Sequence, residues 1–156
     1  MDRIDACCAN EVLPGPAPTR VLLVENDAQL RELFGLGLTR AGYDVVYAAD
    51  GKEVLDHLES SFAAEGHFGR FDVVVSDIRM PGFSGFHLLV ALRHWSPELP
   101  VILMTAFADE GTRRDARRLG AVAVLSKPFQ LHALASAVEQ AKIGSAPQTV
   151  RPSPDP

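Results

Sequence analysis

The stretch Phe71-Asp72-Val73-Val74-Val75-Ser76-Asp77-Ile78-Arg79-Met80-Pro81-Gly82 decides the fold that this sequence predicts. Its three consecutive valines are typical of a short strand that is buried on both faces. Its Met-Pro-Gly ending favours a turn directly afterwards. Asp77 therefore lies where a strand meets a loop, which is the edge at which open parallel α/β sheets bind ligands. On this stretch alone, Asp77 is explained equally well as a strand terminator or helix cap.

Composition and charge define the broad class of protein. The 156 residues are enough for one domain, and 47% hydrophobic with 22% charged residues is ordinary for a globular chain. Lys and Arg total 15 against 20 Asp and Glu, and the formal net charge of -5 argues against binding nucleic acid through overall charge. The adjacent Cys7 and Cys8 fit neither a metal pair nor a disulfide framework, so a reducing, cytoplasmic setting is expected. The sequence shows no secretory signal and no apolar run near the ~20 residues that span a bilayer, so no membrane partner is expected.

Strand-like and helix-like patterns alternate five times between residues 20 and 142. Strands are expected at 21–24, 43–48, 71–76, 101–104 and 121–125. Helices are expected at 28–41, around 54–58 with an extension past Ser60, and at 84–95, 108–119 and 130–142. Repeated strand–helix–strand units favour right-handed crossovers and helices on both faces of a parallel sheet. The sequence therefore predicts an α/β fold, a doubly wound five-stranded parallel sheet.

The two flanking segments lack such a pattern. Residues 1–19 end in closely spaced prolines and a glycine, which favours a flexible leader. Residues 143–156 are rich in Pro and Ser and are expected to form a disordered tail. The predicted domain is therefore 20–142.

Polar residues stand at the ends of four predicted strands, and they are Glu25, Asn26 and Asp27, then Asp77, Thr105 and Lys127. Because parallel strands share one C-terminal edge, these side chains can converge. Clustered oxygens suit Mg²⁺, while a hydroxyl and an ammonium group suit phosphoryl oxygens. An Asp beside Mg²⁺ can act as a nucleophile and form an aspartyl-phosphate. The combination predicts phosphoryl chemistry more strongly than any single residue does.

These motifs resemble the receiver domain of two-component response regulators across nearly all of residues 20–142. The resemblance is carried by Val21-Leu22-Leu23-Val24-Glu25-Asn26-Asp27, Asp77-Ile78-Arg79-Met80-Pro81-Gly82, Met104-Thr105-Ala106 and Ser126-Lys127-Pro128-Phe129. It implies a flavodoxin-like sheet with strand order 2-1-3-4-5. It also implies that Asp77 is the phosphoacceptor, that Thr105 is the switch hydroxyl, and that Lys127 pairs with the phosphoryl oxygens. The ligands of Mg²⁺ would be Asn26, Asp77 and the backbone carbonyl of Arg79, while Glu25 would act through a metal-bound water. The Lys127-Pro128 peptide bond would be cis.

The sequence departs from the family pattern at two site positions. Asn26 stands where the family usually has a second carboxylate, so weaker metal affinity is expected, with Asp27 as a partial replacement. Val124 stands where the family has an aromatic three residues before the active-site lysine, which leaves the movement of Thr105 as the readout. The segment from Ser60 to Arg70 also looks longer than the usual connection.

The expected function is a phosphorylation-controlled switch of a two-component phosphorelay. A histidine kinase or phosphotransfer protein would phosphorylate Asp77 with Mg²⁺, and the output would be contact with a downstream protein rather than nucleic acid. The only catalysis expected is self-catalysed phosphotransfer and autodephosphorylation. Because only residues 143–156 follow the last helix, a stand-alone receiver is expected. Homodimerisation through the last two helices is left open.

Three alternatives stay open at this stage. Asn26 could make the chain a phosphorylation-independent binding module with a receiver fold. A phosphotransferase or hydrolase acting on small substrates is disfavoured, because no cap insertion is present to enclose them. The near match of residues 82–86 to G-x-S-x-G makes a serine hydrolase a remote third alternative.

The four arginines between 113 and 118 are either a solvated helix face or part of a partner surface.

Overall fold

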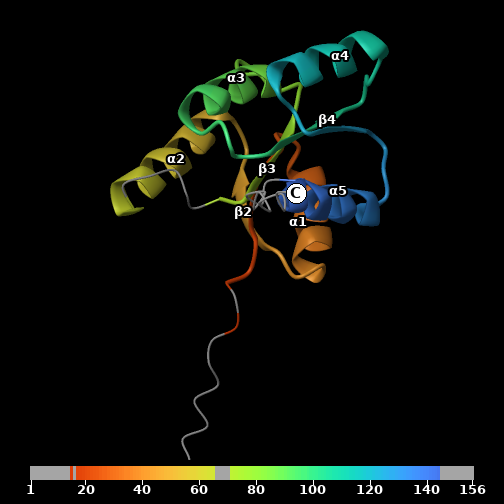
Figure 1. Ribbon diagram of the computed structural model, residues 1–156. Helices are drawn as coiled ribbons and strands as arrows, with labels where there is room; N and C mark the ends of the chain where they lie inside the picture. Colours follow the sequence, from red (N-terminus) through yellow and green to blue (C-terminus); the bar gives the residue numbers. More distant parts are fainter. Residues whose placement is uncertain (1–14, 16, 66–70, 145–156) are drawn as a thin grey trace, which may run out of the picture.

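Five parallel strands form one sheet through the centre of the molecule (Figure 1). The computed structural model describes residue 15 and residues 17–65 and 71–144. In these residues the sheet order is β2-β1-β3-β4-β5, and each neighbouring pair is parallel. The strands are β1 (Arg20–Val24), β2 (Asp44–Ala48), β3 (Val73–Asp77), β4 (Val101–Thr105) and β5 (Ala123–Ser126). The predicted fold class and strand order are confirmed.

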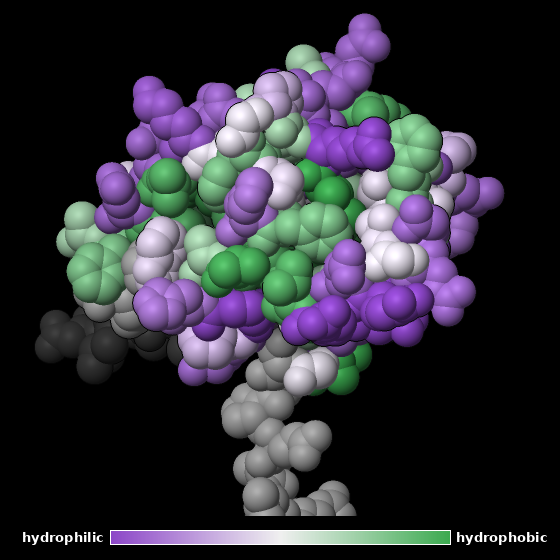
Figure 2. Space-filling view, turned by 90° about the horizontal axis from the view of Figure 1, so that it is seen from above, coloured by the Kyte–Doolittle hydropathy of each residue, from purple (hydrophilic) through white to green (hydrophobic). Residues whose placement is uncertain are grey.

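Helices cover both faces of this sheet, and they are α1 (Ala28–Arg40), α2 (Gly51–Glu65), α3 (Gly85–Trp95), α4 (Glu110–Leu119) and α5 (Leu131–Gly144). Helices α1 and α5 lie together on one face, and α2, α3 and α4 lie on the other (Figure 1). Figure 2 shows the molecule from above, where apolar side chains lie among hydrophilic ones. No helix of the described residues is long and apolar enough to cross a membrane.

Element bounds differ from the sequence predictions by a few residues. Asp77 is the last residue of β3 rather than the residue after it, and Gly51, expected in a turn, begins α2. The extension of α2 reaches Glu65, as expected. Helix α5 continues to Gly144, two residues past the expected domain boundary of 142. Most of the expected leader and the remainder of the expected tail lie outside the described residues.

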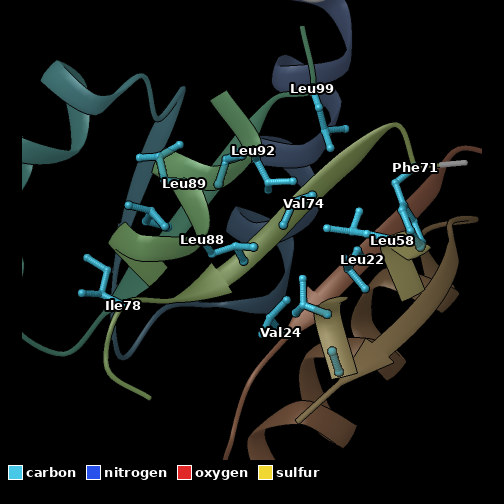
Figure 3. Packing of buried hydrophobic residues seen from close by; sticks show 14 of the residues in the cluster. Leu22, Val24, Leu58, Phe71, Val74, Ile78, Leu88, Leu89, Leu92 and Leu99 are labelled. Atoms are coloured by element: carbon cyan, nitrogen blue, oxygen red, sulfur yellow. The ribbon is translucent and has the colours of Figure 1, made fainter. Parts of the chain in front are cut away.

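The core consists of two apolar layers, one on each face of the sheet. Alternate residues of the central strands point to opposite faces, because successive side chains of a strand do so. Val74 thus contributes to the layer under α2 and α3, while Val73 and Val75 contribute to the layer under α1 and α5. Figure 3 shows the first layer, with Val74 among Leu22, Leu58, Leu88 and Leu92. Burying each such side chain contributes roughly 1.5–3 kcal/mol, so the two layers hold the strand ends in register.

Helix caps fix where the loops at the C-terminal edge of the sheet end. Asp27 caps α1 and accepts hydrogen bonds from the backbone amides of the second and third helical residues. Ser84 caps α3 in a reciprocal arrangement with His87. Asp109 caps α4, and its hydrogen bonds from Thr112 hold the pKa of the Asp109 carboxyl below its usual value. These caps use side-chain oxygens to satisfy amides that lack helical partners.

Candidate functional site

Asp77 lies at the C-terminal edge of the sheet, buried at the end of the fully buried strand β3. Its neighbour across the sheet is Met104 of β4, and the amide of Ile78 donates to the carbonyl of Met104 at 2.9 Å. A methyl group added at Gly85 would lie 2.5 Å from the Asp77 carbonyl oxygen, so only glycine lets α3 approach this closely. Asp77 therefore ends a strand that lies between β1 and β4, and the first turn of α3 packs against its backbone.

Lys127 joins two carboxylates that come from different strands. Its Nζ atom lies 2.7 Å from Oε2 of Glu25 and 3.4 Å from Oδ2 of Asp77. The Glu25 side chain is 1% exposed, and its other oxygen, Oε1, accepts a hydrogen bond from the Asp27 amide at 3.2 Å. The Lys127-Pro128 peptide is cis, as the family resemblance implies. The cluster of Glu25, Asp77 and Lys127 thus has one cation between two anions.

Thr105 is the fourth strand-end group of this site. It is the last residue of β4 and is 2% exposed. Its hydroxyl oxygen accepts a hydrogen bond from the Phe107 amide at 3.0 Å, and its carbonyl accepts one from the Lys127 amide at 2.8 Å. The second hydrogen bond joins the end of β4 to the loop after β5 and so fixes the position of the Lys127 backbone relative to that of Thr105.

An open cavity of about 500 Å³ lies beside the loop that follows β3. It is lined by Asn26, Ile78, Arg79, Met80, Pro81 and Ser84. The Oδ1 atom of Asp27 caps α1, so this oxygen is engaged in the start of the helix. In the described part of the chain, no group of three His, Cys, Asp or Glu side chains is placed to hold a metal. The oxygens that are present, two carboxylates, one amide and a backbone carbonyl, nevertheless fit a hard cation such as Mg²⁺.

A second cavity, of about 320 Å³, opens on the Lys127 side of the site. It is lined by Leu30, Leu33 and Phe34 of α1, by Ala106, and by Lys127, Pro128 and Phe129. The rings of Phe34 and Phe129 stack with their centroids 4.9 Å apart, and Lys127 Nζ lies 5.8 Å from the centroid of Phe34. This groove, called the α1 groove below, is mostly apolar. Of its lining residues, the helical pattern of the sequence indicates Leu30, Leu33 and Phe34.

Several contacts at the site were not predicted from the sequence. The guanidinium carbon of Arg79 lies 4.4 Å from the centroid of the Phe107 ring. Arg31 donates through Nη1 to the Glu25 carbonyl at 2.8 Å. Arg113 donates to the carbonyls of Ala108 at 3.3 Å and Val124 at 3.4 Å. The contacts of Arg79 with Phe107 and of Arg113 with Val124 join residues from different elements, so no local sequence signal marks them.

The near match to a serine-hydrolase motif has a structural explanation. The Ser84 hydroxyl accepts a hydrogen bond from the His87 amide as the cap of α3. His87 Nδ1 in turn accepts from the Ser84 amide at 3.2 Å. The serine and histidine are therefore occupied in ending a loop and starting a helix.

Comparison with known proteins gives consistent matches in sequence and in structure. The family described as response regulator receiver domain matches residues 21–139. The transcriptional regulatory protein GlrR of Escherichia coli K12 is 36% identical over 132 residues, which cover 85% of this chain and 28% of GlrR. The transcriptional regulatory protein FixJ of Bradyrhizobium diazoefficiens is 32% identical over 121 residues, covering 78% of this chain and 55% of FixJ. The chain therefore spans between about a quarter and about half of these curated relatives.

Solved structures of similar proteins have the same architecture. The chemotaxis protein CheY4 of Vibrio cholerae superimposes with a TM-score of 0.71 at 30% identity, over 80% of this chain and 99% of that one. Full-length FixJ from B. japonicum gives a TM-score of 0.72 at 30% identity, over 85% of this chain and 61% of that one.

Proposed function

This chain belongs to the response regulator receiver domains, and we propose that Asp77 is its phosphoacceptor in a phosphorylation-controlled switch. One observation carries the proposal: Lys127 Nζ lies 3.4 Å from Asp77 Oδ2 at the open edge of the sheet. A buried strand end is an unusual place for a carboxylate unless a cation or a reaction requires it there. The lysine meets the first need in the resting protein, and its three donors suit phosphoryl oxygens as well.

The proposed reaction transfers a phosphoryl group to an oxygen of Asp77. The carboxylate attacks phosphorus while the bond from phosphorus to the donor breaks, and the donor leaves with that electron pair. With a histidine kinase or phosphotransfer protein, the broken bond is to an imidazole nitrogen, and the product is an acyl phosphate. Lys127 neutralises charge on the transferred oxygens, and the Thr105 hydroxyl donates a hydrogen bond to one of them.

A metal is part of this proposal, and the chain has the oxygens to hold it. Glu25, Asn26, Asp77 and the Arg79 carbonyl would bind Mg²⁺, with Glu25 acting through a water. When bound, Mg²⁺ supplies positive charge that reduces repulsion between the carboxylate and the phosphoryl group. The exposed amide of Asn26 contributes an oxygen without charge, so we expect metal binding to be weaker than in a site with three carboxylates.

The α1 groove is the proposed docking surface for the protein donor. A protein that presents a phosphohistidine to Asp77 must cover the mouth of the site, and Lys127 lines both the site and this groove. Leu33 lies in the groove and is 47% exposed, which gives a partner an apolar contact beside the reacting groups. Docking here would exclude water from the transfer.

The output is proposed to pass through the loop after β4. A hydrogen bond from Thr105 to the phosphoryl group shifts the population of conformations of this loop and of α4. Arg113 of α4 already contacts the Val124 carbonyl of β5, so movement of α4 changes the surface between them. A downstream protein would recognise that surface. Because one relative, NtrC of Escherichia coli K12, is named as a DNA-binding transcriptional regulator, both the absence of nucleic-acid output and the stand-alone character stay predictions.

Incubation with acetyl phosphate and Mg²⁺, followed by intact-mass measurement, tests the assignment. We expect wild type to gain one phosphoryl mass and Asp77→Asn to gain none. Asp72→Asn is the matched control, since Asp72 flanks the start of β3 and pairs with the Arg20 amide, away from the site. If wild type stays unmodified while a known receiver reacts, the phosphoacceptor proposal is wrong. The alternative, a binding module that needs no phosphorylation because of Asn26, would then be favoured.

A further inference from the structure

Two side chains that the proposed reaction does not use meet across the mouth of the site. Arg79 comes from the loop between β3 and α3, and Phe107 comes from the loop between β4 and α4. The guanidinium carbon lies 4.4 Å from the ring centroid, within the range of a cation–π interaction. We infer that this pair, the Arg79–Phe107 latch, positions the Thr105 hydroxyl and opposes its movement.

The latch reaches Thr105 through one hydrogen bond. The Phe107 amide donates to Thr105 Oγ1 at 3.0 Å, so the position of the Phe107 backbone sets where that oxygen is held. The Phe107 side chain is 59% exposed, so core packing does not fix it. The contact with Arg79 is therefore the interaction that restrains the Phe107 side chain.

Thr105 has little other freedom. It is 2% exposed, its backbone belongs to β4, and its carbonyl accepts from the Lys127 amide. The hydroxyl can change partners in two ways. It can rotate about χ1 and leave the Phe107 amide, or it can move with the loop, which draws the Phe107 ring from Arg79. The first route breaks the hydrogen bond that the latch helps to position, and the second route breaks the Arg79–Phe107 contact itself.

The consequence rests on the proposed function, in which Thr105 turns to a phosphoryl oxygen. A cation–π contact at an exposed site contributes about 0.5–1 kcal/mol, which corresponds to a factor of about two to five in the resting equilibrium. The latch therefore favours the resting position of Thr105 by about that factor. Arg79 and Phe107 are positioning residues in this scheme, because neither side chain needs to touch the phosphoryl group.

The test measures the latch with and without phosphorylation. Solvent exchange of the Phe107 amide is followed by NMR in the unphosphorylated protein, where Thr105→Val gives the value for a fully released amide. Phosphorylation by acetyl phosphate with Mg²⁺ and the decay of the product are timed in the same variants. Arg79→Gln removes the cation, and Phe107→Leu removes the aromatic face. Arg79→Lys and Phe107→Tyr keep them. Arg40→Gln is the matched control, because it removes one exposed arginine at the far end of α1.

We expect Arg79→Gln to raise the exchange rate of the Phe107 amide by about two- to five-fold. Arg79→Gln and Phe107→Leu should each raise the phosphorylation rate by a similar factor. The double variant should react no faster than either single variant, because both changes break the same contact. Phe107→Tyr and Arg40→Gln should stay near wild type, and Arg79→Lys should keep the wild-type exchange rate of the Phe107 amide. Unchanged exchange and phosphorylation in Arg79→Gln would overturn the inference. Equal increases in phosphorylation and decay would also overturn it, because the pair would then act as a cover against solvent. If wild type takes no phosphoryl group, the proposed function fails, while the exchange measurement still decides on the latch.

Discussion

Replacing Asn26 with Asp should tighten Mg²⁺ binding, because it restores a charge that the site lacks. The site has two carboxylates, Glu25 and Asp77, with Lys127 within 3.4 Å of both, so the three groups together carry one negative charge. Asn26 is exposed and lines the cavity beside Asp77. An added carboxylate there doubles the net negative charge that faces a bound cation, with little effect on packing.

The size of the effect follows from the exposure of this position. Two unit charges about 4 Å apart attract each other by about 1 kcal/mol in water, and water is the appropriate medium for an exposed side chain. A divalent cation doubles this to about 2 kcal/mol, which is about a thirty-fold lower dissociation constant. This is a lower estimate, because direct coordination would shorten the distance.

Isothermal titration with Mg²⁺ after treatment with a chelator measures the change. Asp27→Asn is the matched control at the next position, because Asn caps α1 as well as Asp does and the Asp27 Oδ1 atom is already engaged in the cap. It should change affinity by less than about two-fold. The double variant Asn26→Asp/Asp27→Asn has the wild-type net charge but should bind as tightly as Asn26→Asp. If the double variant binds like wild type, total charge controls affinity and the position of the carboxylate does not, which would refute the reasoning.

Three other substitutions test separate parts of the molecule. Lys127→Gln should lower the free energy of unfolding by about 3 kcal/mol, because it leaves the buried Glu25 without its cation. Chemical denaturation should show a smaller loss for the double variant Glu25→Gln/Lys127→Gln. Equal losses would contradict the ion-pair explanation. Burial, with the hydrogen bond and charge of Glu139, raises the pKa of Tyr43 to about 12. The raised pKa of Tyr43 contributes to the stability of the folded protein. This contribution is complete below about pH 10 and is lost as the pH rises toward 12. Tyrosinate absorbance should show a lower pKa in Glu139→Ala, and Tyr43→Phe identifies which signal belongs to Tyr43. Leu33→Glu should slow phosphotransfer from a phosphohistidine protein by about ten-fold or more, while acetyl phosphate reacts at the wild-type rate; equal rates from the protein donor would remove the α1 groove from the proposal.

The sequence predicted the sheet because its signals are local. Three β-branched residues at 73–75 require burial on both faces, and only a central strand of a parallel sheet offers that. The same strand carries Asp77 to the C-terminal edge, where the ends of β4 and β5 also lie. Thr105 and Lys127 were therefore predictable as neighbours of Asp77 once the strands were in order. Their chemical roles came from the family resemblance, which the fold and the matches to receiver domains support.

The directions of individual side chains were not predictable. From the sequence, Asp27 could bind a metal or cap the helix. In the structure its Oδ1 atom accepts hydrogen bonds from amides in the first turn of α1. That outcome is physically reasonable, because amides at a helix start lack partners and an Asp one residue before the helix reaches them easily. The contact of Arg79 with Phe107 joins two loops whose spacing depends on the whole sheet. No periodicity or motif in the chain records such a distance.

The ion pairs of Lys127 suggest how a divalent cation near Glu25 would act in the proposed switch. Lys127 is closer to Glu25 than to Asp77, and among the described residues the Glu25 carboxylate has otherwise only the Asp27 amide as a hydrogen-bond partner. In the proposed switch, a phosphoryl group on Asp77 would replace one negative charge with about two and so attract Lys127 away from Glu25. The buried Glu25 carboxylate would then be left without a cation, which costs several kcal/mol. The phosphorylated state therefore gains more from a divalent cation than the resting state does. Asn26 weakens that cation's binding, so the charge at position 26 should control how readily the switch turns on.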